Sequence, residues 1–233
     1  MSIRVVFFDA GNTLLRMDYA VIAAELARHG VPVAPDAVQR AEWQARVHLD
    51  DQVFARAAGA STETQESATR YMGFVLEGLG VGDARTVERV ARWRSTYNPP
   101  VGVWTTHDPQ ALEALALVRQ SGARAAAISN SNGSVESVLA AVGLASYLDF
   151  VVDSGEVGVE KPNPRIFELA LARAGVGASE AAYIGDLYSI DVRGASAAGL
   201  RAVLLDPGGF WGKRDCATAP DLLSAVRLAL SWK

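Results

Sequence analysis

The octapeptide Phe7-Phe8-Asp9-Ala10-Gly11-Asn12-Thr13-Leu14 joins an apolar run to a polar turn. Residues 4–8 have the composition of a buried strand, and Asp9 follows at its carboxyl end. In an open α/β sheet, ligands bind in the crevice outside the carboxyl ends of the strands. Three later motifs also follow apolar runs: Ile128-Ser129-Asn130, Glu160-Lys161-Pro162, and Ile184-Gly185-Asp186 with Asp191 five residues on. We therefore expect all four motifs to converge on one crevice.

Five short apolar runs alternate with segments of helical pattern, which is typical of the βα units that build a parallel sheet. Their nearly uniform apolar composition indicates strands that are covered on both faces. Capping residues before prolines should start two of the helices, at Asp108 and Asn163, and glycines should end them, at Gly122 and Gly175. The predicted strands are residues 4–8, 125–128, 150–152, 182–184 and 201–205.

Residues from about 16 to 97 contain no strand-like run and predict four helices. Thr62 and Gln65 have the spacing of a capping box at the start of the third helix. We expect residues 1–15 and 98–233 to form one α/β core, with residues 16–97 as an α-helical insert. The second helix carries an amphipathic stripe with spacings of three and four residues, made of Val38, Ala41, Ala45, Leu49 and Val53.

The composition is that of an ordinary globular protein, with 50% hydrophobic and 21% charged residues in a chain of 233. A net charge of −4 gives no electrostatic reason to expect nucleic acid or an anionic membrane as a partner. The single cysteine, Cys216, excludes an internal disulfide and fits a reducing compartment. No apolar stretch approaches the ~20 residues that a membrane-spanning helix needs. We expect a soluble, cytoplasmic protein.

In this order, and with an insert after the first, the four motifs resemble the haloacid dehalogenase superfamily over essentially the whole chain. The resemblance implies an α/β fold in which a Rossmann-like parallel sheet core carries an α-helical cap domain. Most members of that superfamily use an aspartate nucleophile and magnesium to transfer phosphoryl groups. The resemblance thus implies an enzyme that forms an aspartyl-phosphate intermediate with a small phosphorylated substrate.

Each motif then matches a role in the active site of the superfamily. Asp9 matches the nucleophile, Lys161 the cation that stabilises charge beside it, and Ser129 a hydrogen-bond donor to a phosphoryl oxygen. Asn130 and Arg16 are further candidate contacts of the substrate, with a role in the turn as the alternative for Asn130. Few ligands, all of them oxygens, suit Mg²⁺ with several retained waters. The candidate ligands are Asp9, the backbone carbonyl of Gly11, Asp186 and Asp191.

Other polar residues near these motifs fit structural roles. Asn12 and Thr13 lie in the loop after the nucleophile and fit a turn. His29 lies in the last turn of a predicted helix, where a cation opposes the helix dipole. We expect the polar side chains off the apolar stripe to be exposed to solvent, with contact to substrate as the alternative. These side chains are Trp43, Arg46 and His48.

Gly11 departs from the phosphatases of the superfamily, which carry a second aspartate two residues after the nucleophile. That aspartate protonates the leaving oxygen and later activates water, and general acid–base catalysis contributes about 10²–10⁴ in rate. Dehalogenases and phosphonate-cleaving relatives also lack it. Phosphonate cleavage uses a cap lysine as a Schiff base, and no lysine precedes Lys161 here. The dehalogenases need no magnesium and lack a Gly-Asp motif like that at Asp186.

The function predicted from the sequence is a magnesium-dependent hydrolase with an aspartate nucleophile, acting as a phosphatase on a small phosphorylated metabolite. Turnover of simple phosphomonoesters should be poor, because Gly11 cannot act as acid or base. A substrate with a good leaving group, such as an acyl phosphate, would need no acid. Two alternatives stay open: a 2-haloacid dehalogenase-like hydrolase, and a non-catalytic protein that keeps the pocket as a phosphate-binding or interaction module.

Overall fold

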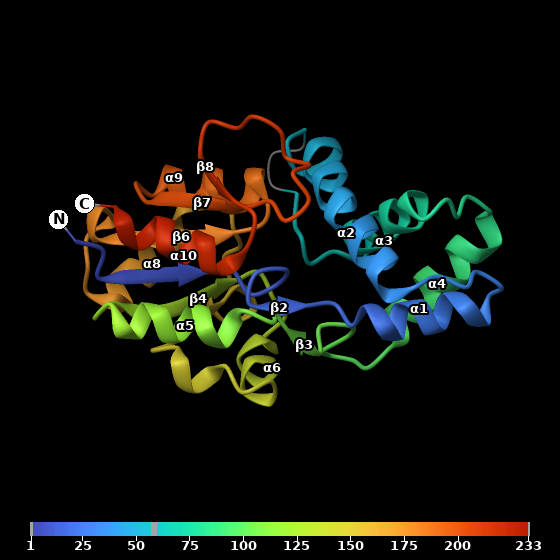
Figure 1. Cartoon of the computed structure of the whole chain (residues 1–233), viewed down its shortest axis with the longest axis horizontal. Helices are drawn as coiled ribbons and strands as arrows, with labels where there is room; N and C mark the ends of the chain where they lie inside the picture. Colours follow the sequence, from blue (N-terminus) through green and yellow to red (C-terminus); the bar gives the residue numbers. More distant parts are fainter. Residues whose placement is uncertain (1, 57–59, 233) are drawn as a thin grey trace.

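Six parallel strands form the central sheet, and the computed structural model describes residues 2–56 and 60–232 (Figure 1). The predicted α/β fold with a Rossmann-like sheet is confirmed. The sequence pattern does not predict the edge strand β8, whose three residues, Ala-Thr-Ala, carry little apolar signal. The order across the sheet is β5 (Val151–Asp153), β4 (Arg124–Ser129), β1 (Val5–Phe8), β6 (Ala181–Gly185), β7 (Arg201–Leu205) and β8 (Ala217–Ala219).

The strands are buried because alternate side chains enter two separate hydrophobic layers. In β1, Val6 and Phe8 pack into one layer, whereas Val5 and Phe7 pack into the other. The first layer is covered by α5 (Ala111–Gln120), α6 (Val135–Ala141) and α10 (Leu222–Ser231). The second is covered by α8 (Pro164–Ala174) and α9 (Arg193–Ala197). Burial on both faces explains why the strand sequences are almost uniformly apolar.

Capping residues set the helix ends largely where the sequence places them. Asn163 Oδ1 accepts from the backbone N–H of Arg165, and Gly175 ends α8 in the left-handed conformation with φ 65°. Helix α5 begins at Ala111, later than predicted, although Asp108 still caps the chain there by accepting from the N–H of Gln110. The short elements are α7 (Ser154–Val157), η2 (Ala145–Tyr147), η3 (Ala178–Glu180) and the π-helical η4 (Tyr188–Val192).

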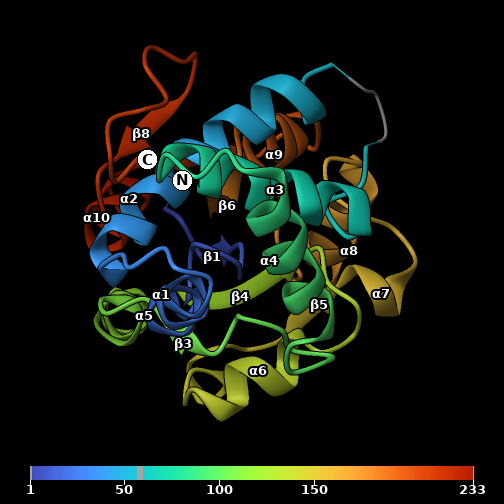
Figure 2. The ribbon, with the colours of Figure 1, turned by 90° about the vertical axis from the view of Figure 1, so that its right-hand side faces the viewer.

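Four helices and a π-helical segment lie together at one end of the molecule, beyond the carboxyl ends of the strands (Figures 1 and 2). Within residues 20–56 and 60–95, no strand occurs. A two-stranded antiparallel ribbon, β2 (Leu15–Arg16) with β3 (Thr106–His107), leads the chain out and back. The exact boundaries after residues 15 and 97 stay a prediction. The helical elements are α1 (Tyr19–Arg28), α2 (Pro35–Leu49), η1 (Asp50–Phe54), α3 (Gln65–Gly78) and α4 (Ala84–Thr96).

The predicted stripe is confirmed, since all five of its residues are buried in a hydrophobic cluster shared by these helices, although Val53 lies in η1 and the other four lie in α2. The predicted capping box is wrong, although α3 does begin at Gln65. Thr64 caps it instead, with Oγ1 accepting from the N–H of Ser67 at 3.1 Å. Thr62 points away, toward the carboxyl end of β4, and accepts a hydrogen bond from Asn130.

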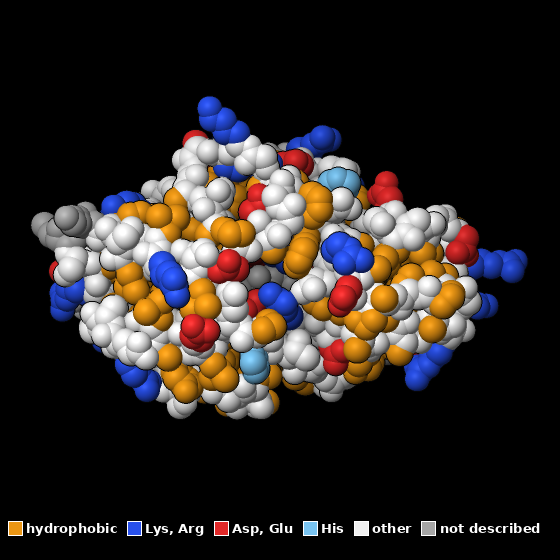
Figure 3. All heavy atoms as spheres, in the orientation of Figure 1, with side chains coloured by type: hydrophobic (Ala, Val, Ile, Leu, Met, Phe, Trp, Pro, Cys, Tyr) orange, Lys and Arg blue, Asp and Glu red, His pale blue; other side chains and the backbone are white. Residues whose placement is uncertain are grey.

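On the face of the molecule drawn in Figure 3, basic and acidic side chains are interspersed, with no large patch of one sign. Among the described residues, none of the helices has the length and apolar composition to cross a membrane.

Candidate active site

Asp9 lies at the carboxyl end of the central strand β1, and the neighbouring strand fixes its backbone. Its backbone N–H donates to the carbonyl oxygen of Ile184 at 2.8 Å, and the residue is only 7% exposed. Burial raises the pKa of Asp9 to about 7, although the Lys161 ammonium opposes the rise. The sheet thus presents a carboxylate on a rigid support, as attack on phosphorus requires.

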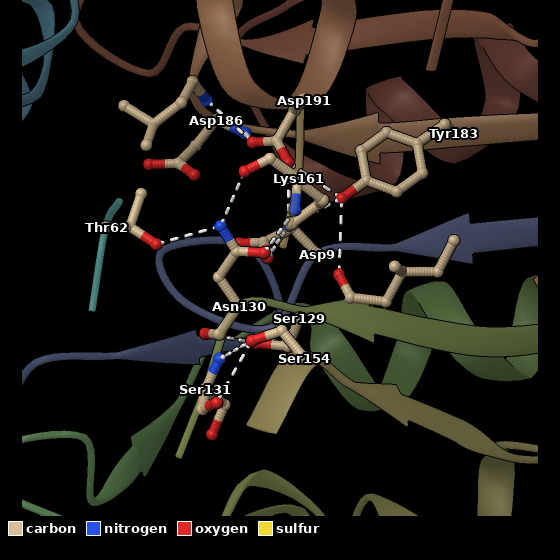
Figure 4. A network of polar contacts seen from close by, with 12 residues as sticks. Asp9, Thr62, Ser129, Asn130, Ser131, Ser154, Lys161, Tyr183, Asp186 and Asp191 are labelled. Carbon is tan, nitrogen blue, oxygen red and sulfur yellow. Dashed lines mark hydrogen bonds and ion pairs between the residues drawn. The ribbon is translucent and has the colours of Figure 1, made fainter. Parts of the chain in front are cut away.

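Lys161 holds its ammonium group against three oxygens (Figure 4). Nζ donates to Oδ1 of Asp9 at 2.5 Å, to Oδ1 of Asp191 at 2.8 Å and to Oη of Tyr183 at 2.9 Å. An ammonium group has three donors, so all of them are engaged. Burial alone would lower the pKa of Lys161, but the two carboxylates raise it above its ordinary value. Lys161 is therefore a charged, fully engaged neighbour of Asp9.

Asn130 aligns the segment that carries Lys161. Its Oδ1 accepts from the backbone N–H of Lys161 at 2.7 Å, and its Nδ2 donates to the Lys161 carbonyl oxygen at 3.0 Å. The same Nδ2 lies 3.0 Å from Oγ1 of Thr62, which joins this loop to the helical end. Ser129 ends β4 beside it, is buried, and lines the same cavity as Asp9. The geometry gives Asn130 a positioning role, which is the alternative that the sequence left open.

Both carboxylate oxygens of Asp191 accept hydrogen bonds. Oδ1 accepts from Lys161 and from Tyr183 at 2.8 Å each, and Oδ2 accepts from the backbone N–H groups of Asp186 at 3.1 Å and Leu187 at 2.9 Å. A β-carbon at Gly185 would lie 2.5 Å from Cγ of Asp191, so this close approach requires glycine. Asp191 therefore fixes both the Gly-Asp loop and the lysine.

Three carboxylates offer a set of ligands for a metal ion. Oxygens of Asp9, Asp186 and Asp191 all lie within 4.8 Å of one another. Burial raises the pKa of Asp186 well above its ordinary range, and the Arg46 guanidinium opposes this only in part. Among the residues that the structure describes, only two cations, Lys161 and Arg46, face these three carboxylates, so the oxygen donors and the remaining negative charge fit a divalent ion. Asp9 and Asp186 are the freer ligands, because Asp191 already accepts four hydrogen bonds.

Arg46 contradicts the expectation that it is exposed to solvent. It is 3% exposed on α2, and it pairs with Glu42 through Nε–Oε1 at 2.9 Å and Nη2–Oε2 at 2.6 Å. Nη1 lies 3.3 Å from Oδ2 of Asp186. Glu42 is fully buried and also accepts from the hydroxyl groups of Tyr19 and Tyr71. The helical end therefore places the buried, hydrogen-bonded guanidinium group of Arg46 against Asp186 of the acidic site.

The other polar side chains of the helical end lie outside this cluster. His48 is exposed, as expected, with its ring edge-on to Phe74. Trp43 is half-buried and lines a second, smaller cavity. His29 has the expected structural role, since its Nε2 lies 3.0 Å from Oε1 of Glu25.

Arg16 does not reach the site, contrary to the prediction of a substrate contact. Its Nη2 forms an ion pair with Oδ2 of Asp108 at 2.5 Å. Both residues line the second cavity, of about 180 Å³, and neither lines the one that contains Asp9. The β2–β3 ribbon turns Arg16 toward the segment that starts α5.

A cavity of about 560 Å³ lies between the strand ends and the helical end, and Asp9, Lys161 and Asp186 line it. Gly11 and Trp104 face each other in this cavity. A β-carbon at Gly11 would lie 3.5 Å from Cη2 of Trp104, which is ordinary van der Waals contact, and the backbone of Gly11 has no left-handed φ. The backbone therefore does not demand glycine here. The indole instead limits the space that a longer side chain at position 11 would need.

Several residues of the site carry little signal in the sequence. Glu42 and Arg46 have the i, i+4 spacing of a helical ion pair, which could have indicated their pairing. Tyr183 lies inside an apolar strand, where its hydroxyl group gives no sign of a partner. Trp104 lies in an irregular segment far from Gly11 in sequence, so only the fold brings them together.

The sheet topology and the site define an α/β enzyme whose buried aspartate, lysine and acidic cluster lie at the carboxyl ends of parallel strands. The haloacid dehalogenase-like hydrolase family matches residues 3–199, and the chain belongs to that family.

Individual relatives include both phosphatases and dehalogenases. Haloacid dehalogenase-like hydrolase domain-containing protein 3 of Homo sapiens is 31% identical over 215 residues, which cover 88% of this chain and 82% of that protein. Phosphoserine phosphatase of Thermus thermophilus is 42% identical over 115 residues, or 49% of this chain and 45% of that one. The structure of a 2-haloacid dehalogenase from Pseudomonas syringae has a TM-score of 0.58 and 25% identity, and the match covers 99% of this chain and 100% of that one.

Proposed function

We propose that the protein is a magnesium-dependent phosphatase that uses Asp9 as nucleophile on a small phosphorylated metabolite. One observation carries the proposal: the Asp9 carboxylate lies 2.5 Å from a buried, charged lysine and within 4.8 Å of two further carboxylates. The similarity to a phosphoserine phosphatase supports the same reaction. Residues 16–97 would serve as the cap over the site, and the single cysteine agrees with a cytoplasmic location.

The chain's own residues account for most of the first step. An oxygen of Asp9 bonds to phosphorus while the bond from phosphorus to the leaving oxygen breaks, and that oxygen keeps the electron pair. Lys161 favours the ionised form of Asp9 and holds it in place, and its positive charge stabilises the negative charge that develops on the phosphoryl oxygens. Ser129 would donate to one of those oxygens. Water then bonds to phosphorus, the bond to Asp9 breaks, and phosphate leaves.

A magnesium ion held by Asp9, Asp186 and the carbonyl of Gly11, with Asp191 beside them, would neutralise charge on the phosphoryl group. The proton for the leaving oxygen must come from water or from the substrate, because Gly11 has no acidic group. Substrates whose leaving group departs without a proton, such as acyl and aryl phosphates, should therefore react best.

A second candidate is hydrolysis of 2-haloacids. It is favoured by the indole of Trp104 beside Gly11 and by Arg46, which already places a cation against Asp186. The 25% identity to a 2-haloacid dehalogenase supports it as well. In that reaction Asp9 would attack carbon and displace halide, without a metal ion.

One panel of substrates separates the candidates. Phenyl phosphate, an alkyl phosphate, acetyl phosphate and 2-chloropropionate are each incubated with the protein, with magnesium and with chelator. We expect magnesium-dependent release of phosphate from the acyl and aryl substrates. Chloride release that chelator does not affect would establish the dehalogenase, and no turnover of any substrate would favour a non-catalytic binding protein.

A further inference from the structure

Two cations line the cavity that contains Asp9, and only one of them is engaged. Among the described lining residues these are Lys161 and Arg94. All three donors of Lys161 already meet Asp9, Asp191 and Tyr183. A second anionic group on a substrate would therefore find no free donor on Lys161.

Arg94 lies in the last turn of α4, and its Nε is buried without a hydrogen-bond partner. Within residues 2–56 and 60–232, no carboxylate comes within ion-pair distance of its guanidinium group. Burial lowers the pKa of Arg94, and Tyr71 and Glu63 oppose this shift only in part. Buried donors in proteins are almost always paired, so an unpaired one calls for an explanation.

Other arginines near the cavity show what a structural arginine looks like in this fold. Arg46 is paired with Glu42 and Asp186, and Arg16 is paired with Asp108. A position in the last turn of a helix favours a cation through the helix dipole, but this explains neither the burial nor the direction into the cavity. Glu63, the carboxylate that acts electrostatically on Arg94, is exposed and accepts a hydrogen bond from the hydroxyl group of Thr62.

We propose that Arg94 recognises a second anionic group of the substrate, a carboxylate that the molecule carries in addition to its phosphoryl group. The substrate class is then a small phosphorylated carboxylic acid. A guanidinium group matches a carboxylate with two parallel hydrogen bonds. Tyr97, Pro99 and Pro100 line the same cavity as Arg94. This inference rests on the proposed phosphatase function, but it can be tested without turnover.

The test measures calorimetric binding of four non-hydrolysable probes in the presence of magnesium. The probes are 4-carboxybenzylphosphonate, its neutral 4-carbamoyl counterpart and benzylphosphonate, with the 3-carboxy isomer as a second geometry. We expect at least one carboxylated probe to bind about tenfold or more tightly than the carbamoyl probe, the gain typical of a charge-assisted pair. Arg94→Leu and Arg94→Gln should remove this preference and leave benzylphosphonate binding within about twofold.

Two matched variants control the result. Arg92→Leu removes an exposed arginine of the same helix, paired only with Glu88, and should change nothing. Glu63→Gln should preserve or increase the preference, whereas a loss equal to that in Arg94→Leu would mean that Glu63 and Arg94 are structural partners. Thermal unfolding checks that the Arg94 variants are folded. If Arg94→Leu does not fold, Arg94→Gln serves as the test, because glutamine retains polar contacts.

Hydrolysis of p-nitrophenyl phosphate is measured on the same samples and reports on the phosphatase proposal separately. If the native protein binds the probes with the expected preference but does not hydrolyse p-nitrophenyl phosphate, the role of Arg94 stands and the phosphatase proposal is wrong. Equal binding of carboxylated and carbamoyl probes by the native protein, or a preference that survives in both Arg94 variants, would overturn the inference.

Discussion

The cavity that contains Asp9 is lined on one side by the ends of the sheet and on the other by the helical end, and charged side chains on the two sides differ in how fully they are paired. On the sheet side, Lys161 and Asp191 are hydrogen-bonded at every donor or oxygen, with distances between 2.5 and 3.1 Å. On the helical side, Arg94 has a buried Nε with no hydrogen-bond partner in the described part of the chain, and the residues that line the cavity there are mostly polar and uncharged, among them Thr64 and Gln65. Under the proposed function, the sheet would supply a prearranged reaction site, and the helical end would recognise the substrate.

Arg46 is the exception that joins the two sides. It belongs to the helical end, yet its guanidinium group reaches Asp186, 3.3 Å away on the sheet side. A second link lies nearby, where the Asp50 carboxylate accepts from the backbone N–H and hydroxyl of Ser189 at 2.8 Å each. The helical end is therefore tied to the acidic loop through buried polar contacts, and its position bears directly on the site.

The largest effect should come from Asp9→Asn. We expect kcat to fall by about 10⁴-fold or more, since removal of a nucleophile abolishes the covalent step. The fold should survive, because Lys161 keeps its bonds to Asp191 and Tyr183. Steady-state kinetics on an aryl phosphate and thermal unfolding measure the two quantities. Asp36→Asn, at an exposed acid of α2, is the matched control, and near-native activity in Asp9→Asn would rule out aspartyl catalysis.

Lys161→Met should have the next largest effect and should lower both rate and stability. Loss of the positive charge beside Asp9 should lower kcat by about 10²–10³-fold, as loss of one stabilising group does in other active sites. Breaking a buried ion pair from one side costs about 3–5 kcal/mol in the free energy of unfolding, because the partner carboxylates stay buried. Denaturant unfolding and kinetics provide the readouts, with the exposed Lys213→Met as control. A variant as stable as the native protein would show that the close contacts of Lys161 contribute little.

Introducing an acid at position 11 should have a smaller effect, and it should increase activity rather than reduce it. Gly11→Asp should raise turnover of alkyl phosphates, at most by about 10²-fold, the lower end of the range for acid–base catalysis. The gain should be larger in combination with Trp104→Ala, because the indole limits the space for the carboxyl group. Acyl and aryl phosphates should be little affected.

Trp104→Ala alone is the control for this pair. If the double variant folds, binds magnesium and still gains nothing on alkyl phosphates, the missing acid does not limit the reaction. The dehalogenase-like candidate would then become the stronger one.

The sheet side was largely predictable from sequence because strand ends are local features. Asp9, Ser129 and Asp186 each follow an apolar run, and parallel topology brings such positions to one edge. Lys161 and Asp191 follow from the same motifs, and the structure places all five around one cavity. Once the strand order is known, the proximity of these five residues follows from it.

The helical side was not predictable in the same way, because tertiary packing decides which polar side chain is buried. Arg46 lies off the apolar stripe of α2, and only the neighbouring Glu42 and Asp186 make its burial tolerable. Arg16 follows the nucleophile loop closely in sequence, but a two-residue ribbon turns it to Asp108. Thr62 has capping-box spacing, yet Thr64 is nearer to the first turn of α3 and caps it.

The central claim is that Asp9 accepts a phosphoryl group with the help of a magnesium ion at Asp186. Beryllofluoride mimics a phosphoryl group on a carboxylate, so its binding, followed by fluorine NMR, tests the claim directly. The account predicts that the native protein and Asp36→Asn bind beryllofluoride only with magnesium present, and that Asp9→Asn and Asp186→Ala do not bind it. Native protein that binds no beryllofluoride with magnesium, or Asp9→Asn that binds it as well as the native protein, would contradict the account.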